Sequence, residues 1–157
     1  MEIMMRPAVV AVCVFLLFAV QTNAVYASKL MENRAKADQY YLKQDYKKAY
    51  RIYYKLAREG DHHSQNKIAM IYANGEGKSV DLTEAYAWSV LAAQGGQEEF
   101  LKSRDDLLQQ IDNKNRARGK AQDLKEKYGN DALVEKQANR SSNTRSNRCT
   151  GSRLACK

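Results

Sequence analysis

The feature of this sequence that most restricts its fold is a segment that occurs twice, 36 residues apart. Residues 45–60 read DYKKAYRIYYKLAREG, and residues 81–96 read DLTEAYAWSVLAAQGG. Asp45, Ala49, Tyr50, Ala57 and Gly60 are matched by Asp81, Ala85, Tyr86, Ala93 and Gly96. An aspartate suits the start of a helix, because its carboxylate accepts backbone N–H groups, and a glycine suits the residue after the end. Each copy therefore predicts one helix.

The segments that precede the two copies also match, at an offset of 32 residues: Ala37 and Tyr40 align with Ala69 and Tyr72. The offset is smaller because the second unit has a longer linker, residues 74–80, where the first has only Lys43-Gln44. Each unit is then helix, turn, helix, and the predicted helices are residues 30–42, 45–59, 64–74 and 81–94. None of them buries its apolar stripe alone, so the units must stack.

The composition agrees with a helical chain. There is a single proline, Pro7, and 44% of the residues are hydrophobic. Long stretches without clustered turn residues favour helices over a β-sandwich. Alanines within the repeat let helices approach closely, and Tyr and Trp fill the space between them. We expect an all-α fold, a short, right-handed α-solenoid of antiparallel helix pairs with capping helices.

The second unit carries a longer pattern, Tyr72-x-x-Gly75-x-Gly77-x-x-x-Asp81-x-x-x-Ala85-x-x-Trp88-x-x-x-Ala92-Ala93-x-x-Gly96. This pattern resembles the Sel-one-like repeat, a relative of the tetratricopeptide repeat. The resemblance covers residues 45–96 well and residues 30–128 loosely, and residues 97–128 resemble the terminal capping helices of small bacterial members. It implies an α-solenoid that serves protein–protein interaction and scaffolding, in a family with many periplasmic or secreted members.

The N-terminal segment has the pattern of a secretory signal peptide. An apolar run of 13 residues, 8–20, follows Arg6, and small residues lead to Ala27. We predict a signal peptide over residues 1–27 with cleavage between Ala27 and Ser28, and Ala24 is the second candidate site. An uncleaved membrane anchor is the alternative, although a span needs about 20 apolar residues. The mature protein is thus expected in the periplasm or outside the cell.

The repeat domain, residues 28–128, is followed by a basic tail, residues 129–157. From Lys136 to Lys157 there are six basic residues and no acidic one, a composition that predicts disorder. After export the chain keeps Cys149 and Cys156, which predicts a disulfide, with two free thiols as the alternative. The tail either docks on anionic envelope polymers or lipid headgroups, or contacts nothing.

Chemical motifs are sparse. The two histidines are adjacent, in Asp61-His62-His63, and neighbouring helical residues point about 100° apart, which disfavours a shared metal. Glu98-Glu99 and Asp105-Asp106 have basic neighbours and are typical of solvated helix faces. No phosphate loop, dinucleotide fingerprint or Ser/His/Asp order is present. We expect no catalytic residue, no cofactor and no metal, and the near-neutral repeat domain argues against nucleic acid as a partner.

The expected function is a scaffold that binds an envelope protein through the groove lined by the first helix of each pair. Since Ile68, Ala69 and Tyr72 should face the core, other positions of these helices remain for contact. The candidate partner-binding residues are Asp38, Leu42, Lys67, Met70 and Asn74. An accessory protein that docks through its tail is the alternative. A β-lactam-binding enzyme is the least expected, because the family members associated with that activity have a disulfide in each repeat.

Overall fold

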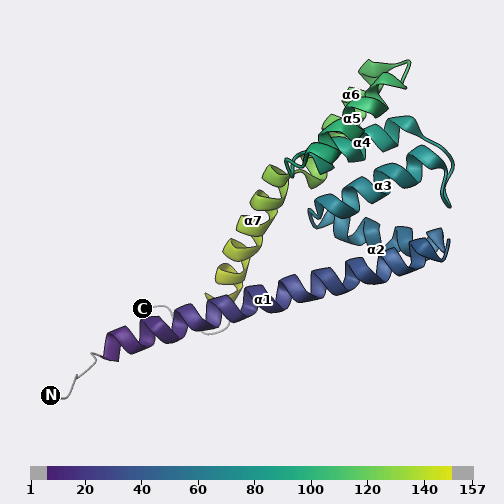
Figure 1. The fold of residues 1–157 in the computed structure, drawn as a ribbon. Helices are drawn as coiled ribbons and strands as arrows, with labels where there is room; N and C mark the ends of the chain where they lie inside the picture. The colour runs from purple at the N-terminus through teal and green to yellow at the C-terminus, as the bar shows by residue number, and fades with distance from the viewer. Residues whose placement is uncertain (1–6, 150–157) are drawn as a thin grey trace.

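The computed structural model describes the backbone of residues 7–149 and the side chains of residues 25–140. Over this range the chain forms helices and no strands (Figure 1). The helices are α1 (Pro7–Leu42), α2 (Tyr46–Arg58), α3 (His62–Asn74), α4 (Leu82–Ala93), α5 (Glu98–Gln109), α6 (Lys114–Tyr128) and α7 (Asn130–Cys149). The predicted all-α fold is confirmed.

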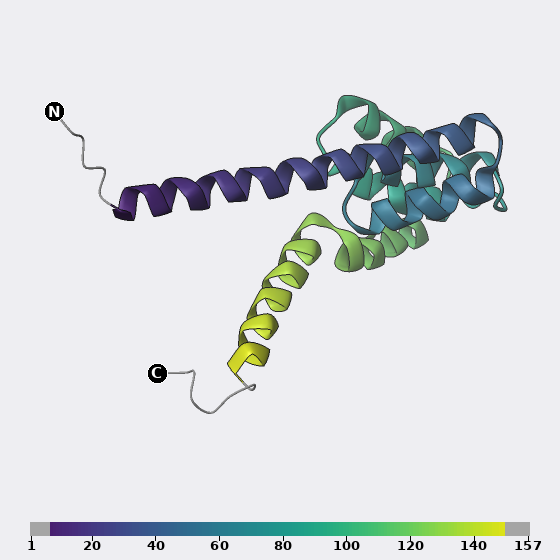
Figure 2. The ribbon, with the colours of Figure 1, turned by 90° about the horizontal axis from the view of Figure 1, so that it is seen from below.

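The helices stack in chain order as a short solenoid. Helix α1 packs on α2, α2 on α3, and α3 on α4, and α4 then contacts both α5 and α6. Helix α7 packs on α6 alone among its stronger contacts and extends from the stack as an arm (Figure 2). The start of α1 and the end of α7 project on the same side of the stack in both views (Figures 1 and 2).

Aspartates start three of the helices, as the repeat predicts for two of them. Asp45, Asp61 and Asp81 each accept a hydrogen bond from the backbone N–H three residues later, at 3.3, 3.0 and 2.9 Å. Because Asp61 caps α3, that helix begins at His62, two residues before the predicted start. Helix α1 begins at Pro7, far upstream of residue 30, since proline is tolerated in a first turn and no other proline or glycine precedes Leu42.

The loop between α3 and α4 depends on glycine. Gly75 and Gly77 both have positive φ, 75° and 73°. A Cβ on Gly77 would lie 2.8 Å from Cβ of Tyr46, so only glycine lets this loop pack on the start of α2. The loop closes where the Asp81 backbone N–H donates to the Tyr72 carbonyl at 3.0 Å. The repeat glycines thereby join the second helix pair to the first.

The core is made of small residues around large aromatic rings. Trp88 is 2% exposed, with the ring of Tyr54 edge-on at 5.7 Å and the ring of Tyr128 stacked at 5.8 Å. Among the described residues, eight alanines are fully buried between the helices: Ala37, Ala49, Ala57, Ala69, Ala85, Ala87, Ala92 and Ala117. Aromatic area fills the spaces that the alanines leave, which is the packing that the repeat composition predicts.

Helix α7 covers residues 130–149, where the composition predicts disorder from residue 129. No glycine or proline interrupts this segment, and its first turn is anchored on the stack. The Asn130 backbone N–H donates to Oε1 of Gln94 at 3.1 Å, and Leu133 lies against Gly60. The predicted disulfide lies outside the described side chains, because it joins Cys149 to Cys156.

The predicted cleavage site lies within α1, where Ala27 and Ser28 are both exposed on the helix surface. Among the residues that the structure describes, no helix combines the length and the apolar character that a membrane crossing requires.

Candidate functional site

On the face formed by α1 and α3, polar contacts within the chain join α1 to the N-terminal end of α3. Arg34 on α1 forms an ion pair with Asp61, whose side chain is 2% exposed. Asp38 accepts a hydrogen bond from the phenol of Tyr53 and lies 3.7 Å from Nε2 of His63. Burial, and then the contact with Asp38, raises the pKa of Tyr53, so this phenol is neutral and donates. Burial lowers the pKa of His63.

Further along the same face, Tyr41 joins α1 to the loop after α3. The Tyr41 hydroxyl donates to Oε2 of Glu76, and Nζ of Lys67 lies 5.2 Å from the centre of the Tyr41 ring. Burial and the hydrogen bond to Glu76 raise the pKa of Tyr41, which keeps the donor protonated. We call this set of contacts between α1 and the α3 region the α1–α3 seam. These contacts pair polar groups of the face within the chain, and a polar depression of about 420 Å³ lies beside Arg34, Asp61 and His63.

An open depression of about 370 Å³ lies one helix further along the stack, between α3 and α5. Its floor contains apolar atoms of Met70, Ala73 and Leu107. Its rim has polar groups of both charge signs and two amides: Asn74, Glu99, Lys102, Ser103, Asp106 and Gln110. We call this depression the α3–α5 groove. An apolar floor with a polar rim is the usual composition of a protein-binding surface.

The structure places four of the five predicted contact residues in these two sites. Met70 and Asn74 line the α3–α5 groove. Asp38 and Lys67 are engaged in the α1–α3 seam. Leu42, at the last position of α1, is 81% exposed and lies in neither. The α5 side of the groove was not predicted, because the sequence indicates residues 97–128 only as capping helices.

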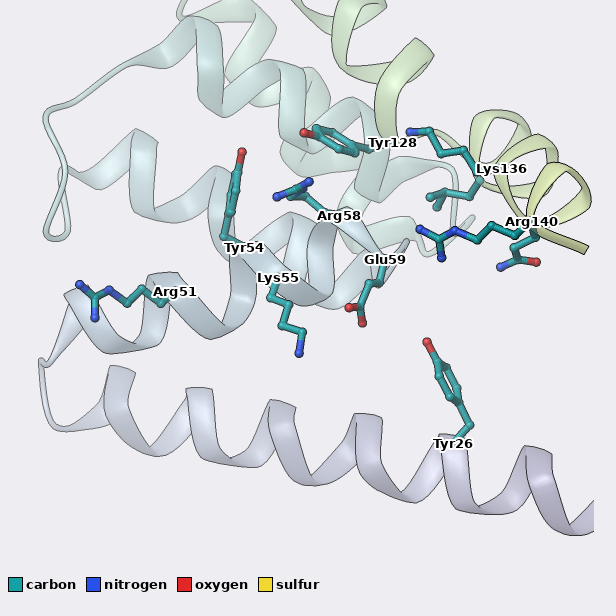
Figure 3. Close-up of a pocket in the computed structure, with 11 residues that line it drawn as sticks. Tyr26, Arg51, Tyr54, Lys55, Arg58, Glu59, Tyr128, Lys136 and Arg140 are labelled. Atoms are coloured by element: carbon teal, nitrogen blue, oxygen red, sulfur yellow. The ribbon is translucent and has the colours of Figure 1, made fainter. Parts of the chain in front are cut away.

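Another depression, of about 460 Å³, lies between α2, α6 and α7 (Figure 3). We call it the α2–α7 pocket. Its lining contains five cationic side chains and one carboxylate, together with three tyrosines, a leucine and a glutamine. These residues are Arg51, Lys55, Arg58, Lys136, Arg140, Glu59, Tyr26, Tyr54, Tyr128, Leu133 and Gln137. The pocket joins residues 51–59 to residues 128–140, and no local pattern in the sequence indicates that juxtaposition.

Aromatic rings hold two of the cations in this pocket. The Arg58 guanidinium lies 5.7 Å from the centre of the Tyr54 ring and 5.5 Å from that of Tyr128. Lys136 approaches the same Tyr128 ring to 5.5 Å. Burial raises the pKa of Tyr54, so its ring is a neutral platform.

The two histidines contact different partners. Nδ1 of His62 lies 3.0 Å from Oε1 of Gln65, whereas His63 faces Asp38. Within the described part of the chain, no three side chains of the metal-ligating types come together as a metal site.

Comparison of the chain with protein-family models, with curated proteins and with solved structures found no match.

Proposed function

We propose that this chain is an exported binding module that holds a segment of another envelope protein in the α3–α5 groove. One observation carries the proposal. The α1–α3 seam already engages Arg34, Asp61 and Tyr41 in an ion pair and a tyrosine hydrogen bond within the chain, whereas the neighbouring α3–α5 groove presents Met70, Ala73 and Leu107 at its floor. An apolar side chain of a partner would bury this floor, and the mixed rim would orient the segment that carries it.

The groove suits a short segment rather than a large rigid surface. A volume of about 370 Å³ accommodates one or two apolar side chains, not a standard interface. Glu99 and Lys102 on the rim carry opposite charges, so the partner segment needs both polar acceptors and donors beside its apolar anchor. A transient partner, or a partner that engages several copies, fits such a surface.

Two further parts of the proposal concern identity and location. The unit from Tyr72 to Gly96 is proposed to be a Sel-one-like repeat, and the Asp81 cap and the positive φ of Gly75 and Gly77 support this. Residues 1–27 are proposed to direct export, on the basis of the apolar run and the small residues before Ser28.

Site-specific photocrosslinking in intact cells tests the groove. A photoreactive residue at Asn74, which is exposed on the rim, should capture a protein that a photoreactive residue at Lys47 does not. Lys47 is the matched control because it is exposed on α2, outside the groove. Equal capture of the same protein from both positions would count against the groove.

The captured protein is then purified and titrated against variants. Met70→Glu places a charge on the apolar floor, and Lys102→Glu reverses a charge on the opposite rim. Each should weaken binding by about tenfold or more, the effect of losing a central contact. Lys47→Glu makes the same charge change outside the groove and should leave affinity within about twofold. Undiminished binding by both groove variants refutes the proposal.

A further inference from the structure

We propose that the α2–α7 pocket binds an anion that carries two or more phosphate groups. The pocket lies away from the α3–α5 groove and is lined by other helices, so this inference stands independently of the proposed partner. Figure 3 shows Arg58 between the rings of Tyr54 and Tyr128, with Lys136 and Arg140 approaching the same opening from α7.

The cations come from two helices that meet only in the fold. Arg51, Lys55 and Arg58 follow one another at helical spacing along one face of α2, over about 10 Å of helix axis. Lys136 and Arg140 are one turn apart on α7. Glu59 is the only carboxylate among the lining residues that the structure describes. The pocket therefore gathers cations of two helices at one opening.

Two of these cations converge on one ring. The guanidinium of Arg58 and the ammonium of Lys136 each lie 5.5 Å from the centre of the Tyr128 ring. At an exposed site a ring attracts each cation only weakly. This attraction does not remove the repulsion between the two cations. An anion that contacts both converts that repulsion into attraction, so the arrangement favours occupancy by negative charge.

The floor of the pocket is fixed to the core. Tyr128 stacks on Trp88 with 13° between the ring planes, and Tyr54 meets the same indole edge-on. Trp88 is 2% exposed. The Arg58 fork, placed against both tyrosine rings, therefore loses less side-chain entropy on binding than a mobile surface lysine loses.

Phosphate fits this pocket better than carboxylate does. A phosphate monoester carries a charge of about −1.5 to −2 and three strong acceptor oxygens, so two such groups match the excess of positive charge. An acidic peptide brings one charge per residue and needs several residues to reach the same charge. The volume of about 460 Å³ accommodates two phosphates on a small scaffold, which concentrates their charge beside the cations.

Isothermal titration of inorganic tripolyphosphate into the full chain tests the proposal, at low and at physiological ionic strength. Saturable binding at one site is expected, and it should weaken as salt rises. The variant Arg58→Gln/Lys136→Gln should bind about tenfold or more weakly, because it loses both cations that meet at Tyr128. Both residues are exposed, so the fold is expected to persist, and thermal unfolding verifies this.

The matched control is Lys47→Gln/Lys125→Gln, which removes the same charge from exposed positions outside the pocket. It should change affinity by less than about twofold. If the double pocket variant unfolds, Lys136→Gln alone replaces it, with a loss of about threefold or more expected.

Equal weakening by pocket and control variants would indicate general charge attraction and overturn the proposal. A tetraglutamate peptide that binds as tightly as tripolyphosphate, with the same dependence on Arg58 and Lys136, would also overturn it, in favour of an acidic peptide. Vesicles with and without cardiolipin, a lipid that carries two phosphates, then identify the source. Cardiolipin-dependent binding that tripolyphosphate displaces indicates a lipid headgroup, and its absence indicates a soluble phosphate compound. Either outcome supports the phosphate assignment.

Discussion

Replacement of Asp61 should destabilise the fold more than any other single change of a charged residue in the α1–α3 seam. Asp61 accepts the Ser64 backbone N–H at 3.0 Å and also forms the ion pair with Arg34. Loss of the N-cap costs about 1 kcal/mol. Breaking a buried ion pair costs about 3–5 kcal/mol, and the 28% exposure of the Arg34 side chain reduces this to about 2–3. Asp61→Ala should therefore lower the free energy of unfolding by about 3–4 kcal/mol.

A second substitution separates the two contributions. Asn caps a helix about as well as Asp but has no charge, so Asp61→Asn should retain the cap and lose only the pairing, about 2–3 kcal/mol. Urea unfolding followed by far-ultraviolet circular dichroism measures both variants, together with Arg34→Gln and the double Asp61→Asn/Arg34→Gln. The coupling energy between the two positions should be about 1–3 kcal/mol. A coupling energy below about 0.5 kcal/mol would refute the argument that this pair holds α1 on the stack.

Two further changes follow from the same contacts and are measured by the same unfolding assay. Gly60 has φ 94°, and a Cβ there would lie 2.7 Å from Cδ1 of Leu133, whereas Gly96 has φ 77° with nothing within 4 Å. Gly96→Ala should cost about 1–2 kcal/mol for the left-handed backbone alone, and Gly60→Ala should cost more, so equal losses would argue against the anchoring of α7. His63 faces Asp38, Arg34 and Lys67, and its pKa is lowered from 6.5 by burial, so the unfolded chain binds more protons. The free energy of unfolding should be fully retained above pH 6.5 and should fall as pH drops below it, and His63→Gln should flatten this dependence.

Local signals were sufficient to predict the repeat helices. The aspartate caps and the positive-φ glycines act within a few residues, so they determine where a helix begins and ends without depending on how the helices pack. Asp45, Asp81 and Gly75 all behave in this way. The extension of α1 to Pro7 and the helix over residues 130–149 were not predicted. The first segment has the composition of a signal peptide, and the second depends on the contact of Leu133 with Gly60.

The candidate sites were harder to predict, because their partners lie far apart in the sequence. Asp38 was expected to be available for a partner, but the tyrosine that occupies it comes from α2. Likewise Glu76 belongs to a loop that the sequence marks only by its glycines, and it meets Tyr41 across 35 residues. Periodicity predicts which face of a helix is buried, but not which polar group of another helix meets it.

Processing of the N-terminus is compatible with both surfaces. Cleavage after Ala27 would remove most of α1, yet every α1 residue of the seam, Arg34, Asp38 and Tyr41, lies downstream of that bond. The α2–α7 pocket would lose Tyr26, which lies across the opening from the cations, and would keep all five of them (Figure 3). Cleavage after Ala24 would instead leave Tyr26 in place. The choice of cleavage site would thus change the width of the α2–α7 pocket without altering the seam, because the seam contacts of α1 come from residues 34–41.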